Sequence, residues 1–200
     1  MKRLVQIAAL GLGIVVVAFK PIDDGIKTLD IKPEASKIEW VGEKITGSHN
    51  GLIALKGGTL QVDGNKIIGG SFEVDMNSMT VEDIQGEYGA KLLGHLKSND
   101  FFAVSDFGTA KFKIEKVESN KSGEYNTMIH GQLSIKGQTH PISFPANVQM
   151  NDGKLAAYGE IEVDRTKYDI HYGSASFFDN LGDKAISDSF KLKVSLGAKI

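Results

Sequence analysis

The histidines are the residues of this sequence best suited to bind a metal or to transfer protons. There are five of them: His49, His95, His130, His140 and His171. No two are spaced two or four residues apart, as metal ligands on one face of a strand or helix are, and the chain has no Cys to complete a zinc site. His171 lies near Asp169 and Asp179, a weaker arrangement that lacks a second histidine. The sequence therefore predicts no metal site.

Paired acids and serines are the other side chains that could support catalysis. Neighbouring carboxylates occur at Asp23 and Asp24, at Glu82 and Asp83, and at Asp179 and Asp183. Glycoside hydrolysis needs two acids across one cleft, and the sequence selects no such pair because solvated loops account for all of them. The serines Ser98, Ser174 and Ser176 lack the G-x-S-x-G context of a nucleophile elbow. We predict that the protein is not an enzyme; a hydrolase that uses the His171 loop is the less favoured alternative.

Alternation of apolar and polar residues defines most of the elements that would position these side chains. In residues 142–150 one face carries Ile142, Phe144, Ala146, Val148 and Met150. With the run before it and the turn at Gly137, this pattern predicts a β-hairpin that has one apolar face. We expect further strands at 36–42, 52–56, 59–62, 66–76, 110–115, 154–164 and 186–196, a turn-rich break at 46–51 and a short helix at 88–96. Strands with a single apolar face cover it by curling into a barrel or sandwich.

Composition narrows the class of protein. The chain has 200 residues, of which 41% are hydrophobic and 24% charged, and this is typical of one globular domain. The net charge of −2 argues against a nucleic-acid-binding protein, which would usually be basic. Because there is no Cys, disulfides, thiol catalysis and bacterial lipoprotein anchoring are excluded.

The N-terminus has the order of a secretory signal. Lys2 and Arg3 precede an apolar run over residues 4–19, and Ala18 offers a small residue for cleavage. We expect a signal peptide over 1–18, a tether over 19–28 and the domain over 29–200. The run is shorter than the roughly 20 residues that a spanning helix needs, so no stable membrane span is expected after cleavage, although an uncleaved anchor is the alternative. Export would place the protein in the periplasm or outside the cell.

Inward-facing residues of such a barrel would form either a tunnel or a solid core. The alternation of apolar and polar positions, which we call parity, assigns a set of residues to the apolar interior. They are Trp40, Phe72, Val74, Met76, Leu92, Phe102, Phe112, Ile114, Ile129, Leu133, Phe144, Val148, Ala157, Ile161 and Phe190. Small inward residues, including Gly131 and Gly159, leave room for an elongated apolar guest. They are also consistent with a packed core in which small residues match large ones, and the pattern alone leaves both open.

Three segments resemble the motifs of one family. They are GHLKSNDFF at 94–102, which continues to TAKF at 109–112, GQLSIKGQTHP at 131–141, and EVDRTKYDI at 162–170. In this order, and with an opening like residues 36–40, they are similar to the YceI-like polyisoprenoid-binding family over about 29–196.

The resemblance implies an all-β fold, an eight-stranded antiparallel lipocalin-like barrel with one short helix. It also implies an interior tunnel that holds a long-chain isoprenoid or another amphiphilic lipid, for carriage, storage or sequestration, and no catalytic residues. The expected ligand is an isoprenoid, quinone or fatty-acid-like lipid, without any cofactor or nucleic acid; a homodimer is left open. The alternative is a structural or partner-binding barrel with a packed interior.

Arg165 continues the inward parity of Ile161 and Val163 to the end of a strand. At a barrel mouth its guanidinium could pair with a phosphate or carboxylate head group. The other reading is structural, with Arg165 stacked over Trp40 by a cation–π contact. Leu92 and Phe102 lie beside the break in the sheet, and we expect their segment to cap one end of the tunnel.

Overall fold

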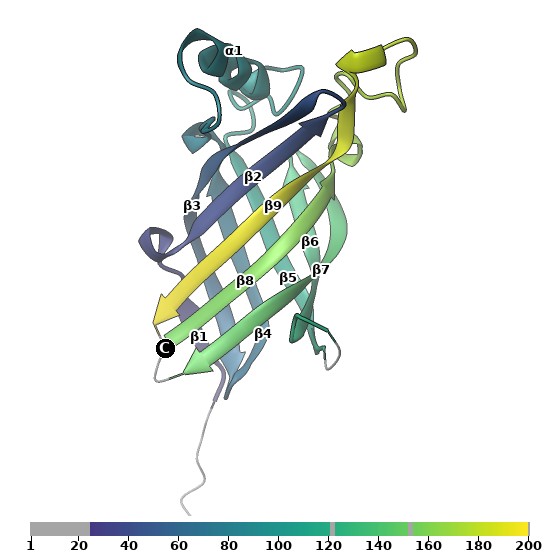
Figure 1. The fold of residues 1–200 in the computed structure, drawn as a ribbon. Coiled ribbons are helices and arrows are strands. Elements are labelled where there is room, and N and C mark those ends of the chain that lie inside the picture. Colours follow the sequence, from purple (N-terminus) through teal and green to yellow (C-terminus); the bar gives the residue numbers. More distant parts are fainter. Residues whose placement is uncertain (1–24, 121–122, 152–153, 200) are drawn as a thin grey trace, which may run out of the picture.

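Eight antiparallel strands close into a barrel in the computed structural model, which describes residues 25–120, 123–151 and 154–199 (Figure 1). They are β2 (Lys37–Lys44), β3 (Gly47–Asp63), β4 (Lys66–Asp75), β5 (Thr109–Ser119), β6 (Thr127–Ile135), β7 (Gln138–Asn151), β8 (Lys154–Asp164) and β9 (Ile186–Lys199). Each strand pairs with the next in sequence, and β2 pairs with β9 to complete the ring. The expected all-β barrel is confirmed. The predicted signal peptide and most of the tether lie outside the described residues.

The first half of the sheet differs from the sequence prediction in one long strand. Of the break predicted at 46–51 only Thr46 lies in a turn, and the two short strands predicted at 52–56 and 59–62 are parts of one strand, because β3 runs from Gly47 to Asp63. Its first part pairs with β2, where Ile53 lies opposite Ile38, and its second part pairs with β4, where Ala54 lies opposite Asp75. The strand thus changes one of its neighbours part-way along its length, and the glycines that looked like turns lie in extended backbone.

A short strand, β1 (Lys27–Asp30), pairs with the end of β3, and Ile31 just after it bridges to Ala198 of β9. Leu29 lies opposite Leu60, and both side chains are buried. The tether expected over 19–28 is therefore wrong in its last two residues, because Lys27 and Thr28 already belong to the sheet. Burial of Leu29 and Ile31 against the barrel explains why the strand forms there.

Apolar side chains of alternating positions fill much of the interior. The rings of Phe72 and Phe112 are stacked with centroids 6.3 Å apart, and Phe112 contacts Phe144 at 5.5 Å. Gly131 makes this stack feasible, because a Cβ on it would lie only 2.7 Å from the Phe112 ring and 2.3 Å from the Lys113 carbonyl oxygen. This small inward residue therefore makes room for a neighbouring ring rather than for a guest.

The α-helix α1 (Gly86–Lys97) covers one end of the barrel, while β1 lies at the other end (Figure 1). It includes the predicted helix over 88–96 and extends it at both ends. Ser98 ends the helix, and its hydroxyl donates to the His95 carbonyl at 2.8 Å. Single 3-10 turns occur at η1 (Pro33–Ala35), η2 (Met76–Ser78), η3 (Arg165–Tyr168) and η4 (Gly182–Lys184). In the described part of the chain, no helix has the length and hydropathy to cross a membrane.

Candidate ligand-binding cavity

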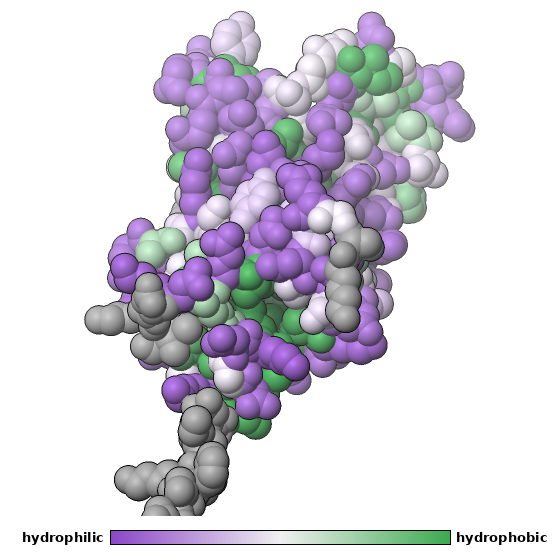
Figure 2. All heavy atoms as spheres, turned by 60° about the horizontal axis from the view of Figure 1, so that its bottom comes forward, coloured by the Kyte–Doolittle hydropathy of each residue, from purple (hydrophilic) through white to green (hydrophobic). Residues whose placement is uncertain are grey.

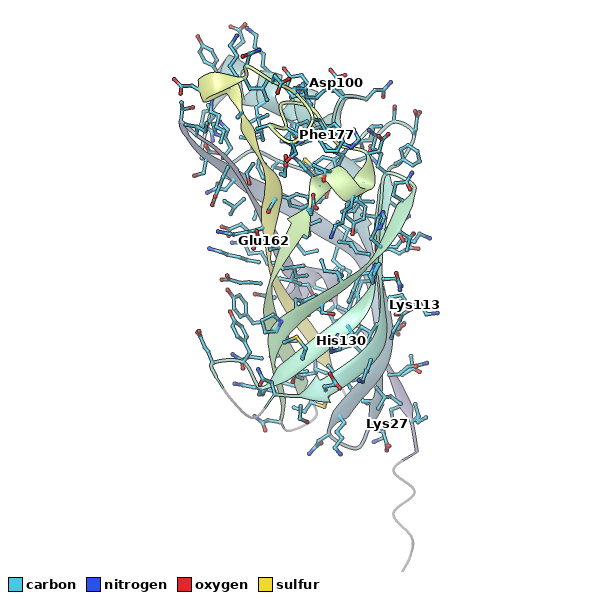
Figure 3. All side chains as sticks on the ribbon, turned by 90° about the vertical axis from the view of Figure 1, so that its right-hand side faces the viewer. Lys27, Asp100, Lys113, His130, Glu162 and Phe177 are labelled. Carbon is cyan, nitrogen blue, oxygen red and sulfur yellow. The ribbon has the colours of Figure 1, made fainter. Side chains whose placement is uncertain are left out.

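The barrel encloses an apolar cavity of about 360 Å³. This volume lies within the range of about 300–1,000 Å³ that is usual for small-molecule sites. Figure 2 looks into the end opposite α1 and shows hydrophobic residues inside the hollow, with hydrophilic residues around it. Figure 3 shows Lys113, His130 and Glu162 on the outside of the wall, and none of these three residues lines the cavity.

All but one of the residues assigned to the interior by parity line this cavity. The exception is Val148, which packs against the core without reaching the cavity. Parity fixes the face of a strand but not the depth along the barrel, so it could not exclude Val148. It also missed Leu55 and Leu60, because β3 was split and its register could not be read, and Ile67, because a register shift near the start of β4 breaks the alternation there.

Helix α1 and the segment after it form the lid of the cavity, as expected from Leu92 and Phe102. Both residues line the cavity, and the Phe102 ring meets the Phe190 ring edge-on at 6.0 Å. Backbone hydrogen bonds fix this segment to the helix end: the Phe102 N–H donates to the Leu96 carbonyl at 3.1 Å. The Ala103 N–H likewise donates to Ser98 at 2.8 Å. The lid is thus an ordered part of the wall.

Trp40 ties the strand wall to the segment that precedes the lid. Its indole Nε1 donates to the Thr80 carbonyl oxygen at 3.0 Å. The close approach requires Gly51 on the neighbouring strand, since a Cβ there would lie 1.9 Å from that oxygen. Trp40 is buried with its ring on the cavity, so its fluorescence is a natural reporter of cavity contents.

Arg165 lies at the lid end with its side chain only 2% exposed. Its guanidinium donates to three backbone carbonyls: Nε to Ser187 at 2.9 Å, Nη1 to Ile170 at 2.7 Å and Nη2 to Ile186 at 3.1 Å. The expected stacking over Trp40 is wrong, because the aromatic partner is Phe101, whose ring centroid lies 5.6 Å from Cζ. The side chain therefore fastens the loop between η3 and β9 to the lid, and most of its donors are already used.

Asp188 is the carboxylate nearest this guanidinium, with Oδ1 3.6 Å from Arg165 Nη2. Its pKa is held below the ordinary value by the hydroxyls of Ser174 and Ser176 and by the Arg165 charge. Burial lowers the pKa of Arg165, and the charge of Asp188 acts in the opposite direction. The two groups therefore form a charged pair behind the lid.

Acidification is expected to destabilise the protein through Asp188. Because its folded-state pKa is depressed, its contribution is complete above the unfolded-state value and is lost as the pH falls through the folded-state value. The variant Asp188→Asn should be less stable than the parent at pH 7 and should lose less stability between pH 5 and pH 3. Melting temperatures of both proteins across this range test the point; parallel curves would show that another carboxylate dominates.

His171 lies among a backbone carbonyl, a carboxylate and an aromatic ring. Its Nε2 lies 3.2 Å from the Thr166 carbonyl oxygen, and its Nδ1 lies 3.6 Å from Asp169 Oδ1. The ring stacks on Phe177 at 3.9 Å, while the Ser176 hydroxyl donates to Asp188. The geometry gives the hydrolase alternative no hydrogen-bonded Ser–His pair in this loop. Within the described ranges, no three His, Asp or Glu side chains gather to hold a metal ion.

Comparison with protein families decides the affiliation of the chain. A family model described as a YceI-like domain matches residues 29–198. The chain belongs to the YceI-like family. The resemblance inferred from the three sequence motifs is thereby confirmed.

Relatives and solved structures agree with this assignment to the YceI-like family. A UPF0312 protein of Shewanella denitrificans is 31% identical over 90 residues, which cover 45% of this chain and 44% of that protein. Burkholderia cenocepacia BcnA has a similar fold, with a TM-score of 0.67 at 17% identity over 84% of this chain and 99% of that chain. A polyisoprenoid binding domain from Saccharophagus degradans gives 0.61 at 12% identity over 86% and 97%. Campylobacter jejuni YCEI protein gives 0.52 at 14% identity over 100% and 99%.

The three motifs of this YceI-like protein meet at the lid end of the barrel. Lys136 of the second motif donates through Nζ to the Asn99 carbonyl of the first at 3.3 Å. The same Nζ donates to the Asp169 carbonyl of the third motif at 2.7 Å. Arg165 of the third motif lies over Phe101 of the first. In this chain the motifs therefore join the lid, the β6–β7 turn and the loop after β8.

Proposed function

We propose that this YceI-like protein binds a long-chain isoprenoid or another amphiphilic lipid in its barrel and releases it chemically unchanged. The observation that carries the proposal is the apolar cavity of about 360 Å³ inside a closed wall. An empty apolar cavity forfeits contacts on one side of every lining atom, and an apolar chain restores them. The fold neighbour from Saccharophagus degradans, described as a polyisoprenoid binding domain, supports the same ligand class.

The apolar lining would supply enough free energy for tight binding. Each CH₂ group removed from water contributes about 0.8 kcal/mol, so ten groups contribute about 8 kcal/mol before the costs of ordering. A net free energy of about 8 kcal/mol corresponds to a dissociation constant near 1 μM, so buried CH₂ groups beyond these ten are needed to offset the ordering costs. A chain of isoprene units thus needs no charged contact to be held.

The physiological role that we propose is carriage, storage or sequestration of such a lipid, for example a quinone, in the periplasm or outside the cell. The location is supported by the pattern of residues 1–18, with its basic start and apolar run. No cofactor is needed for this role. The alternative of a solid interior is disfavoured, since the barrel wall encloses a cavity.

Native mass spectrometry of the protein purified from the periplasm tests the proposal. We expect a non-covalent adduct of isoprenoid or acyl mass at one molecule per chain, which organic extraction removes and identifies. A mass without adduct that stays unchanged after incubation with polyprenyl and acyl lipids would overturn the proposal. In that case the barrel would act through its surface.

A further inference from the structure

Four exposed apolar side chains lie at the lid end of the barrel, and we call them the apolar rim. They are Ile45, which is 68% exposed, and Tyr172, Phe177 and Phe178, which are 48%, 52% and 51% exposed. The loop between η3 and β9 carries the three rings and extends beyond the barrel at the end that α1 covers (Figure 1), and Figure 3 places Phe177 there. The N–H groups of Phe177 and Phe178 donate to the Ser174 carbonyl oxygen at 3.2 and 3.0 Å, so both rings lie on an ordered turn. Apolar side chains that are exposed together mark a binding surface.

The apolar rim borders a gap in the barrel wall. Gly42 of β2 lies opposite Phe190 of β9, but Lys44 lies opposite Ile186, so three residues of β9 face one residue of β2. A bulge of this kind interrupts the hydrogen-bonded ladder between two strands. The exposed residues Lys44 and Ser187 belong to the cavity lining at this gap. The cavity therefore approaches the surface between β2 and β9, beside the lid.

Hydrogen bonds hold the apolar rim against this gap from both sides. The Ser176 hydroxyl donates to Asp188 at 2.6 Å and so ties the turn of Phe177 to the bulged part of β9. On the side of β2, the Ile45 N–H donates to the Ala185 carbonyl oxygen at 3.4 Å. The rim and the gap thus form one continuous feature of the lid end.

Tyr172 joins the apolar rim to the interior of the barrel. Its ring meets the His95 ring at 4.4 Å and the Phe101 ring at 6.4 Å, and both of these residues line the cavity. The Phe101 ring in turn meets the ring of Phe102, a further lining residue, at 5.6 Å. Aromatic rings therefore extend from the surface of the loop to the cavity, and an apolar chain that followed them would remain in contact with apolar surface.

A neutral phospholipid bilayer is the partner that fits the apolar rim. The loop over residues 171–183 contains Asp179 and Asp183 and neither Lys nor Arg, so it offers anionic lipids no attraction. A stable protein interface buries about 800 Å² on each partner, which is more than a few side chains on a protruding loop provide. Aromatic side chains are instead enriched where proteins enter the interface of a bilayer. The proposed ligand, an amphiphilic lipid, dissolves in such a bilayer.

We infer that the apolar rim inserts into the surface of a neutral lipid bilayer and that the lipid enters or leaves the barrel there, through the gap between β2 and β9. The inference rests on the proposed function, since it requires a lipid that occupies the cavity. It assigns loading to the lid end. The opposite end, where hydrophilic residues surround the hollow (Figure 2), stays in water.

The test follows retinol from phosphatidylcholine vesicles to the protein. Trp40, the single tryptophan and a cavity residue, transfers excitation energy to bound retinol and so reports its arrival. The test variant combines Phe177→Ser with Phe178→Ser, two residues that do not line the cavity. The matched control combines Ile26→Ser with Ile68→Ser, because these apolar residues are also exposed but lie next to β1 and at the start of β4, at the opposite end.

The parent should sediment with the vesicles, and its rate of retinol uptake should rise with vesicle concentration. The test variant should take up retinol roughly tenfold more slowly or worse, because two half-exposed rings no longer leave water on docking. Salt should not change the parent's rate, since no ion pair is involved. Retinol added from ethanol should bind the parent and the test variant equally. The control variant should behave as the parent, whereas Ile45→Ser, on the other side of the gap, should slow uptake as well.

Three results would overturn the inference while leaving the lipid-binding function intact. They are equal uptake rates in the parent and both rim variants, a larger loss in the control than in the rim variants, and a rate independent of vesicle concentration, as for retinol that first dissolves in water. Failure of the parent to bind retinol added from ethanol would instead overturn the proposed function itself.

Discussion

Replacing Arg165 with Met is expected to lower the melting temperature by roughly 6 to 20 °C. The change leaves the carbonyls of Ile170, Ile186 and Ser187 without their buried donor and removes the positive charge beside Asp188. Breaking a buried charged network from one side costs about 3 to 5 kcal/mol. For a chain of this size, each kcal/mol changes the melting temperature by about 2 to 4 °C. Thermal unfolding followed by circular dichroism measures the effect.

The control for this variant is Lys167→Met, two residues further along η3. Lys167 is exposed, and its Nζ lies 3.9 Å from Asp164 Oδ2, a surface pair whose loss should hardly change the melting temperature. If Arg165→Met instead melted like the parent but bound charged lipids more weakly, the head-group interpretation of Arg165 would replace the structural one.

Filling the cavity with Ala157→Phe is expected to weaken lipid binding strongly without loss of stability. Ala157 lines the cavity, so the added ring occupies space that the ligand would otherwise fill. Displacing about four CH₂ groups of ligand at about 0.8 kcal/mol each weakens binding by roughly two orders of magnitude. Titration with retinol, a fluorescent isoprenoid alcohol, measures the loss, and thermal unfolding shows that the barrel remains intact.

Ala156→Phe is a matched control because the same substitution is made one residue away on the opposite face. Ala156 is exposed and does not line the cavity. Its variant should bind retinol as the parent does. Equal retinol binding by the parent, Ala156→Phe and Ala157→Phe would place the ligand outside the barrel and contradict the proposed site.

The alternation of apolar and polar residues predicted most strands of the barrel wall, because each strand has one face in the apolar interior. It failed in β3, where Ser48, His49 and Asn50 read as a turn. These residues are extended because β2 lies beside them, with Val41 opposite Asn50. Pairing with a neighbouring strand is a tertiary property, and local sequence signals cannot reveal it.

The site was predictable in its apolar lining and unpredictable in its polar contacts. Parity placed Phe112, Phe144 and Ile161 correctly on the cavity. It could not show that Arg165 would meet Phe101 instead of Trp40, because that contact joins two loops outside the regular strands.

Because β2 pairs with β9, the barrel can close only when the last strand is present. Ile38 lies opposite Val194, so strands from the two ends of the sequence form this part of the wall. While a ribosome is still producing the chain, β2 and β8 each lack a neighbour, and open strand edges of this kind invite pairing with other chains. Contacts between such distant residues also form slowly. The ring of strands can therefore close around its interior only after the last strand has been synthesised.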